Sequence, residues 1–179
     1  MPFTFLPCQI SGLYEIIPKV FEDQRGYFFE TYSIKDFESA GLNTTFVQDN
    51  QSKSSKGTLR GLHFQRKHPQ GKLVRSIQGK IFDVAVDIRP NSHTKGKWFG
   101  IILDDEKKNL FYIPPGFAHG YLALSDHVIF SYKCTDFYYP EYEDGIIWND
   151  PIINIQWPDL NTDYLLSEKD KKLPNYSTN

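Results

Sequence analysis

Apolar and polar side chains alternate over short stretches along most of the chain, which is the pattern of β-strands with one buried face. Residues 82–88 show it most clearly, because Phe, Val, Val and Ile at the even positions alternate with Asp, Ala and Asp. Residues 59–65 alternate in the same way, so Arg60 and His63 are predicted to lie on opposite faces of one strand. From about residue 46 onward the pattern predicts strands and turns.

Turn signals separate these stretches. The apolar and aromatic runs 13–20 and 27–32 flank the sequence Asp-Gln-Arg-Gly at 23–26, which is typical of a turn. Residues 33–36 have the form of a capping box, so we expect a short helix there that Gly41 closes. Further glycines stand at turn-like spacings, namely Gly71, Gly79, Gly96, Gly100, Gly116 and Gly120. Short strands between frequent turns predict a mainly β fold, either a sandwich or a jelly roll with few short helices.

The whole chain, residues 1–179, is predicted to form a single domain. Its length suffices for a substantial core, and the sequence contains no internal repeat, low-complexity tract or linker. We expect residues 167–170 to open a final helical turn and residues 174–179 to form a short flexible tail.

Composition and charge exclude several classes of protein. The formal net charge is −2 and no long basic run occurs, which argues against a nucleic-acid partner but leaves room for a small anionic ligand. No signal-peptide pattern and no membrane-spanning apolar run are found, so we expect a cytoplasmic protein without a membrane partner. Cys8 and Cys134 predict neither a disulfide framework nor a zinc site.

His63 is the first candidate for chemistry. A strand aims an imidazole rigidly, and Lys72 follows nine residues later as a cation that could stabilise negative charge. Proton abstraction next to a carbonyl needs such a pair. A buried histidine with a single hydrogen bond is the structural alternative.

The sequence Pro-Pro-Gly-Phe-Ala-His at 114–119 has the form of the second motif of cupin barrels. Metal-binding cupins pair it with an earlier His-x-His, whereas this chain has His63 followed by Gln65. The motif therefore favours the barrel and argues against a metal. Tyr132 lies in an alternating run and suits either core packing or a general acid. The isolated cations could instead lie on the solvated surface, and the polar run 48–52 could instead be a loop.

Taken together, these segments resemble the dTDP-4-dehydrorhamnose 3,5-epimerase family. The matches include Leu-Arg-Gly-Leu-His-Phe-Gln at 59–65, Gly-Lys-Leu-Val at 71–74 and Ser-Glu-Lys-Asp at 167–170. The others occur in order at 19–21, 23–26, 29–30, 46–50, 83–89, 113–120, 132–133 and 148–150. The resemblance implies a metal-free, cofactor-independent cupin jelly roll that assembles as a homodimer.

The same resemblance assigns roles to matching residues. His63 would be the general base, oriented by Asp170, Tyr132 would be the acid on the opposite face of the sugar, and Lys72 would sit by the C4 ketone oxygen. Three cations would serve the nucleotide diphosphate: Arg25, Arg60 and Lys169. The rest of the pocket would be Glu30, Gln48, Asp49, Asn50, His119 and Glu143. In the family's dimers the neighbouring chain's N-terminal strands complete each pocket, so Arg25 and Glu30 would act across the interface.

The implied reaction inverts C3 and C5 of dTDP-4-dehydro-6-deoxy-D-glucose to give dTDP-4-dehydro-L-rhamnose. Both carbons lie next to the carbonyl, so loss of either proton gives an enolate. The nearest alternative is an epimerase that inverts only C3 or only C5 of a related nucleotide 4-keto sugar. A catalytically silent sugar-nucleotide-binding barrel and a metal-dependent cupin oxygenase are more distant alternatives.

Overall fold

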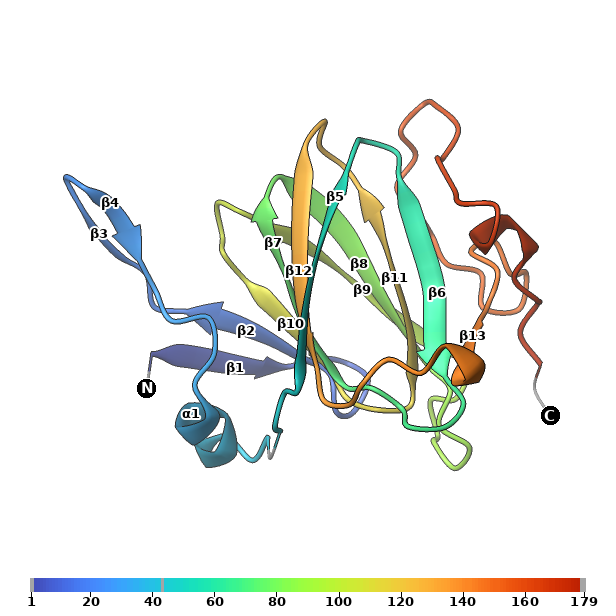
Figure 1. Cartoon of the computed structure of the whole chain (residues 1–179), viewed down its shortest axis with the longest axis horizontal. Helices are drawn as coiled ribbons and strands as arrows, with labels where there is room; N and C mark the ends of the chain where they lie inside the picture. The colour runs from blue at the N-terminus through green and yellow to red at the C-terminus, as the bar shows by residue number, and fades with distance from the viewer. Residues whose placement is uncertain (1, 43, 178–179) are drawn as a thin grey trace.

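Two antiparallel sheets face each other in the computed structural model, which describes residues 2–42 and 44–177 (Figure 1). The six-stranded sheet has the order β1 (Phe3–Pro7), β2 (Tyr14–Pro18), β10 (Leu110–Ile113), β7 (Lys72–Gln78), β12 (Val128–Cys134), β5 (Gln48–Ser54). The five-stranded sheet has the order β13 (Glu143–Gly145), β6 (Leu59–Gln65), β11 (Phe117–Ala123), β8 (Lys80–Asp87), β9 (Trp98–Asp104). This architecture confirms the predicted mainly β jelly roll.

The space between the sheets is filled with side chains from both. Val74 and Phe130 of the six-stranded sheet pack with Ile81 and Leu103 of the five-stranded sheet in one buried cluster. Burial of such side chains contributes roughly 1.5–3 kcal/mol each to folding. The core thereby fixes the spacing of the two inner faces, from which the candidate site is built.

A short helix covers the outer face of the six-stranded sheet. Helix α1 (Ile34–Ser39) begins after Ser33, whose hydroxyl accepts the Asp36 N–H at 3.4 Å, and Gly41 follows it with φ +81°. Its buried Phe37 packs against Ile16 and other residues of the strands beneath it. The helix predicted from the capping pattern is confirmed.

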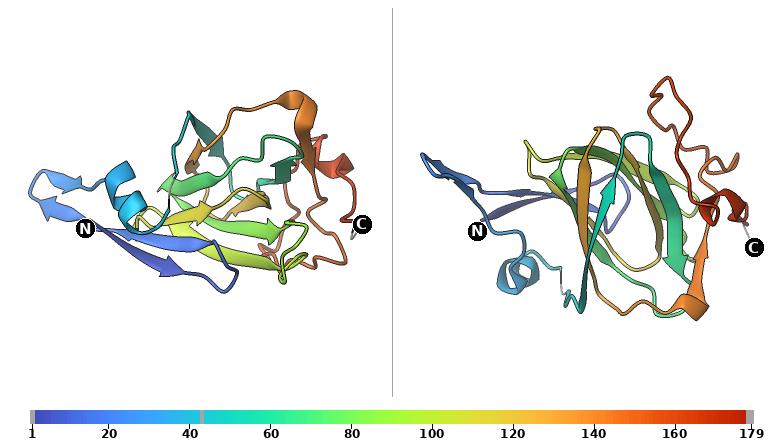
Figure 2. Two further views of the ribbon diagram at one scale, coloured as in Figure 1. Left: turned by 90° about the horizontal axis from the view of Figure 1, so that it is seen from below. Right: turned by 45° about the horizontal axis from the view of Figure 1, so that its top comes forward.

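The N-terminal segment also forms a hairpin that projects from the barrel (Figures 1 and 2). It consists of β3 (Phe21–Asp23) and β4 (Gly26–Phe28), every residue of which is exposed. The turn predicted at 23–26 is confirmed. The apolar and aromatic run 27–32 is in a strand only as far as Phe28, and α1 begins soon after it.

The segment after β13 covers the outer face of the five-stranded sheet. Ile153 and Ile155 pack against Val84 and Val86 of β8, so both faces of that strand are buried. The prediction that residues 82–88 bury only one face is therefore wrong, since this later segment supplies a second apolar layer.

The chain end is attached to the same layer. The expected helical turn is present as the 3₁₀ helix η2 (Asp170–Lys172). A second 3₁₀ helix, η1 (Pro140–Tyr142), precedes β13. Pro174 accepts the Ile147 N–H at 2.9 Å, and the Tyr176 N–H donates to Asp150 at 2.8 Å. Pro174 and Tyr176 of the expected tail are thus bonded to this layer, and residues 178–179 lie outside the described part. Within residues 2–42 and 44–177, no helix has the length and apolar character to cross a membrane.

Candidate active site

A bulge between β6 and β11 brings two candidate residues to the same face. His63 lies opposite His119, but Arg60 lies opposite Tyr121, so three steps along β6 match two along β11. Gly61 has φ +115°, and a Cβ on it would lie 2.6 Å from the Gly120 Cα. The prediction that Arg60 and His63 face opposite ways is wrong, because the bulge breaks the alternation.

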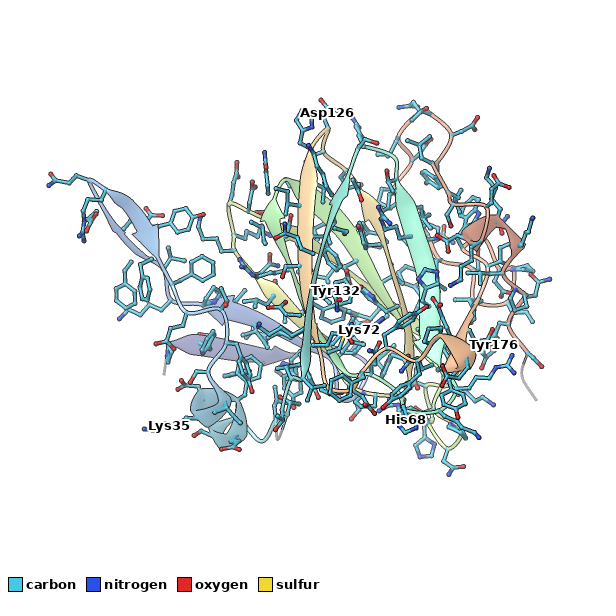
Figure 3. The ribbon with its side chains drawn as sticks, in the orientation of Figure 1. Lys35, His68, Lys72, Asp126, Tyr132 and Tyr176 are labelled. Atoms are coloured by element: carbon cyan, nitrogen blue, oxygen red, sulfur yellow. The ribbon has the colours of Figure 1, made fainter. Side chains whose placement is uncertain are left out.

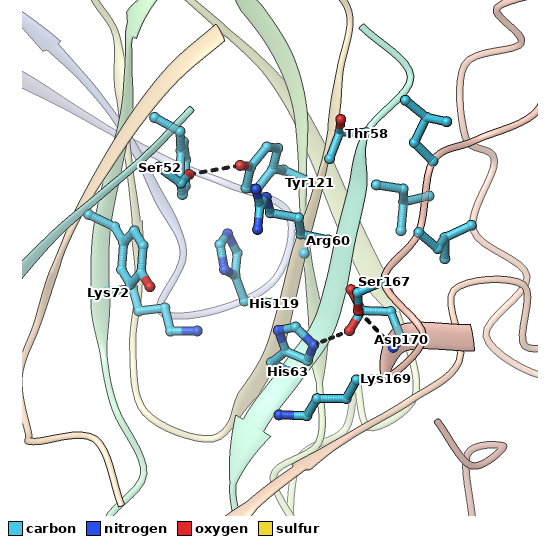
Figure 4. Close-up of a pocket in the computed structure, with 16 residues that line it drawn as sticks. Ser52, Thr58, Arg60, His63, Lys72, His119, Tyr121, Ser167, Lys169 and Asp170 are labelled. Carbon is cyan, nitrogen blue, oxygen red and sulfur yellow. Dashed lines mark hydrogen bonds and ion pairs between the residues drawn. The ribbon is translucent and has the colours of Figure 1, made fainter. Parts of the chain in front are cut away.

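His63 is held by a carboxylate from the far end of the chain. Its Nε2 lies 2.6 Å from Asp170 Oδ1, and the Asp170 N–H donates to Ser167 Oγ at 3.0 Å (Figure 4). Burial alone would raise the pKa of Asp170, but hydrogen bonds from His63, Ser167 and the Gly61 backbone lower it below its usual range. An ionised carboxylate only accepts hydrogen bonds, so His63 Nε2 is the donor in this pair, and in the neutral imidazole Nδ1 is the nitrogen that can accept a proton.

A second histidine–carboxylate pair lies beside the first. His119 Nε2 is 3.0 Å from both oxygens of Asp83, which projects from β8 and is fully buried. Burial lowers the pKa of His119, although Asp83 opposes that change, and burial also raises the pKa of Asp83. The pair places a neutral imidazole in the wall of the site.

Lys72 and Tyr132 come from the opposite sheet. In the register of β7 and β12, Lys72 pairs with Cys134 and Tyr132 with Val74, so their side chains share the inner face. The Lys72 ammonium lies 6.0 Å from the centre of the Tyr132 ring, and both residues lie in the middle of the barrel (Figure 3). No side chain in the described part of the chain forms a hydrogen bond or ion pair with this ammonium.

The pKa shifts of these two residues have the same cause. Burial lowers the pKa of Lys72, an effect opposed by electrostatic interaction with Cys134, Asp83 and Glu143. Burial also raises the pKa of Tyr132, so its phenol keeps its proton at neutral pH. The site therefore contains a protonated phenol, that of Tyr132, on the opposite sheet from the imidazole of His63.

The register of β5 with β12 determines which residues of the polar run 48–52 face the inside of the barrel. Asn50 pairs with Tyr132 and Gln48 with Cys134, so Gln48 and Asn50 face inward. Asp49 pairs with Lys133 on the outer face, where the two side chains form an ion pair of 2.6 Å. The structure therefore brings Gln48 and Asn50 to the site and leaves Asp49 outside it.

Two cavities meet at the candidate residues. The larger, of 460 Å³, is lined by residues that include Arg60, His119, Lys169 and Asp170 (Figure 4). The second, of 310 Å³, is lined by Gln48, Asn50, Gln65, Gln70, Tyr138 and Glu143, among others. His63, Lys72 and Tyr132 line both cavities. These three residues thus mark the junction of one continuous binding space, whose size suits a small-molecule ligand.

Two candidates lie outside this space. Arg25 is in the turn of the projecting hairpin, where its guanidinium pairs with Asp23 at 2.6 Å, and Glu30 is an exposed residue after that hairpin. Neither lines the two cavities of its own chain.

Comparison with known proteins identifies the family. The sequence pattern of the family described as dTDP-4-dehydrorhamnose 3,5-epimerase matches residues 7–178. A protein of that name from Methanothermobacter thermautotrophicus is 55% identical over 170 residues, which is 94% of this chain and 92% of that protein. The chain belongs to the dTDP-4-dehydrorhamnose 3,5-epimerase family.

Solved structures of the dTDP-4-dehydrorhamnose 3,5-epimerase family have nearly the same fold. The enzyme from Elizabethkingia anophelis is 49% identical, with a TM-score of 0.93 over 98% of this chain and 97% of that chain. The Legionella pneumophila enzyme, solved in complex with dTDP-4-keto-L-rhamnose, is 46% identical, with a TM-score of 0.92 over 98% and 99%. The resemblance drawn from the sequence is confirmed.

Several residues of the site were not found from the sequence, among them Asp83, Ser167 and Tyr138. Asp83 could have been, because a charged residue between Ile81 and Ala85 on one strand face indicates a buried partner. Ser167 and Tyr138 gave no comparable signal, since serine and tyrosine are common on surfaces and their local contacts with Asp170 and Glu143 do not by themselves indicate a site.

Metal binding was predicted to be absent. In residues 2–42 and 44–177, no three His, Cys, Asp or Glu side chains are grouped as metal ligands. Gln65, where metal-binding cupins have a ligand, uses its side chain to bind backbone groups instead. The absence of a metal stays a prediction.

Proposed function

We propose that this chain catalyses the epimerisation of dTDP-4-dehydro-6-deoxy-D-glucose at C3 and C5, giving dTDP-4-dehydro-L-rhamnose. The observation that carries the proposal is the two-sided site. A histidine with a free ring nitrogen comes from one sheet, and a protonated tyrosine and a lysine come from the other. A sugar ring between the sheets would be exposed to a base on one face and an acid on the opposite face.

His63 takes the proton from the carbon next to the ketone. Its orientation comes from Asp170, which fixes the Nε2–H and stabilises the imidazolium that forms. A positioned base of this kind accelerates a reaction by roughly 10²–10⁴. The C–H bonding electrons form a C=C bond to the carbonyl carbon, and the carbonyl π electrons move to the oxygen. The ketone thereby becomes an enolate.

Lys72 stabilises that enolate. Its ammonium has no hydrogen-bond or ion-pair partner in the described chain and faces the junction of the two cavities, so it can meet the C4 oxygen. His119, fixed by Asp83, completes the pocket beside it. Charge stabilisation in a site that excludes water is worth several kcal/mol for one well-placed donor, about 2.7–4 in measured cases.

Tyr132 returns a proton to the opposite face of the same carbon. The phenol supplies the hydrogen, the enolate collapses to the ketone, and the centre is inverted. After inversion His63 carries the abstracted proton and Tyr132 lacks one, and proton exchange with solvent restores both groups. No electrons are gained or lost overall, so the reaction requires no oxidant or reductant. We therefore propose catalysis without a cofactor.

The nucleotide end of the substrate is assigned to the remaining polar residues. Arg60 and Lys169 line the larger cavity and suit the diphosphate, because guanidinium and ammonium groups pair with phosphate oxygens. Gln48, Asn50 and Glu143 line the second cavity. We also place the reaction in the cytoplasm. For Asp49, which faces outward, a contact with substrate stays a prediction.

Deuterium incorporation tests the reaction. We expect deuterium at both C3 and C5 when the protein turns over dTDP-4-dehydro-6-deoxy-D-glucose in D₂O, because each inversion exchanges one C–H proton with a group that solvent reloads. NMR of the sugar gives the positions. Exchange at one carbon alone would instead establish the single-centre alternative, and no exchange would overturn the proposed function.

We further propose that two chains form a homodimer that shares its pockets. The hairpin β3–β4 exposes apolar side chains, with Phe28 67% and Tyr27 58% accessible. Exposed apolar patches of this kind mark protein interfaces. Arg25 and Glu30, at the turn and the end of this hairpin, would then reach the partner's cavity.

Mixed dimers test the sharing. Chains with Arg25→Ala and chains with His63→Ala are each expected to be impaired as homodimers, whereas unfolding and refolding them together should restore about one quarter of wild-type activity. Half of the dimers are then mixed, and one of their two sites combines an intact His63 with an intact Arg25. A control mixture of His63→Ala and Asp170→Asn should restore none. No gain in the first mixture would contradict the sharing of Arg25.

A further inference from the structure

An irregular segment, here called the strap, contributes Tyr138 to the wall of the second cavity. It comprises residues 135–139, which connect β12 to η1 and belong to neither a helix nor a strand. Loops of this kind are normally mobile unless their backbone groups are bonded to the body of the protein. Here, each residue from 136 to 139 has a backbone group bonded to a glutamine side chain.

The glutamines come from three places on the barrel. Gln70, which precedes β7, donates to the Asp136 carbonyl at 2.9 Å. Gln48, at the start of β5, accepts the Tyr138 N–H at 3.0 Å. Gln65, at the end of β6, bonds the two remaining residues, 137 and 139. Because β5 and β6 belong to different sheets, the glutamines attach the strap to both sheets.

Gln65 is the central member of this set. Its side chain is almost fully buried, with 6% of the residue exposed. Its amide nitrogen donates to the carbonyls of His68 at 2.7 Å and Phe137 at 3.2 Å, and its amide oxygen accepts the Tyr139 N–H at 2.6 Å. The carboxamide therefore uses both donors and its acceptor to join the strap to the loop after β6.

The strap presents Tyr138 to the cavity. The Tyr138 hydroxyl donates to Glu143 at 2.5 Å, and Glu143 also pairs with Lys169 at 2.5 Å. The bond to Glu143 and burial raise the pKa of Tyr138 to about 12, so this phenol remains a donor. Tyr138 and Glu143 both line the second cavity. The position of the strap thereby sets one wall of the binding space.

We propose that Gln65 is a positioning residue for substrate binding, which holds the strap so that Tyr138 and Glu143 form a fixed wall of the second cavity. The inference rests on the proposed function, because it assigns this cavity to part of the nucleotide sugar. Gln65 does not line the larger cavity with Asp170, and its carboxamide is committed to backbone groups. It acts on binding through the strap, and His63 performs the chemistry independently of it.

Gln65→Met is the main test. Methionine has a similar length but removes all three hydrogen bonds, which leaves the strap free to move before substrate binds. We expect KM for the nucleotide sugar to rise about 5–10-fold, because ordering the strap then opposes binding. The value of kcat should stay within about twofold, since the reacting groups are unchanged. Exposed Gln78→Met, at the end of β7, is the matched control and should leave KM unchanged.

A double-mutant cycle shows whether Gln65 acts through Tyr138. Tyr138→Ala should raise KM, and Gln65→Met in that background should add little, because coupled residues are non-additive. Gln70→Met, which removes one bond to the strap, should raise KM about two- to threefold and serves if Gln65→Met does not fold. Wild-type KM in the Gln65→Met and Gln70→Met variants, or additive effects in the cycle, would overturn the inference. Failure of the wild-type protein to turn over the substrate would overturn the proposed function instead.

Discussion

His63→Ala is expected to abolish deuterium exchange at both C3 and C5 and to lower kcat by about 10²–10⁴. The imidazole is the group that the structure places at the junction of both cavities with a free ring nitrogen. Alanine removes the base but leaves Lys72 and Tyr132 in position. Binding of dTDP should therefore persist, which calorimetry can measure alongside the NMR assay of exchange.

Two variants make the His63 result specific. His93→Ala replaces an exposed histidine in the β8–β9 connection and should leave turnover unchanged. Asp170→Asn keeps the size of the side chain but removes the charge that orients His63, and we expect a smaller loss, at least tenfold. Wild-type exchange at either carbon in His63→Ala would show that another group is the base for that carbon.

Local chemistry made part of the fold predictable. Helix α1 follows from a capping serine and a closing glycine, which act within a few residues of each other. The errors came from contacts that span the chain. The outer face of β8 is covered by residues about 70 positions later, and the bulge at Gly61 depends on how closely β11 approaches. Such contacts are absent from a pattern of alternating residues.

Which residues form the site was harder to predict from the sequence than the local elements of the fold. His63 and Asp170 are 107 residues apart, and only the resemblance to a family joined them before the structure did. The inward faces of β5 could not be chosen from the sequence, because polar residues occupy both faces of that strand. Its register with β12 decides the matter by setting Asn50 beside Tyr132 and Asp49 beside Lys133.

The fold explains why the groups proposed to react oppose one another. His63 and His119 project from the five-stranded sheet, whereas Lys72 and Tyr132 project from the six-stranded sheet, and the core fixes the gap between them. Inversion needs groups on both faces of a planar enolate. Two facing sheets supply such an arrangement on rigid strands, and loops then need only to complete the nucleotide end.

Lys72→Met is expected to lower kcat by about 10²–10³, the usual loss on removing one donor to a developing oxyanion. Methionine fills similar space in the barrel but carries no charge, so the enolate would form without its counter-charge. Deuterium exchange at both carbons should slow in parallel. Lys80→Met, at the exposed start of β8, is the matched control. A Lys72→Met variant with wild-type exchange would remove Lys72 from the mechanism.

The pH dependence adds a second test of Lys72. Burial lowers its pKa below the usual value of about 10.4. The ammonium is therefore present at low and neutral pH and is lost as pH rises through this lowered pKa, so kcat should fall earlier on the alkaline side than an exposed lysine would allow. Because Asp83 opposes the lowering, Asp83→Asn should move the alkaline decline to still lower pH. An alkaline decline at the same pH in Asp83→Asn would show that another group, such as Tyr132, controls it.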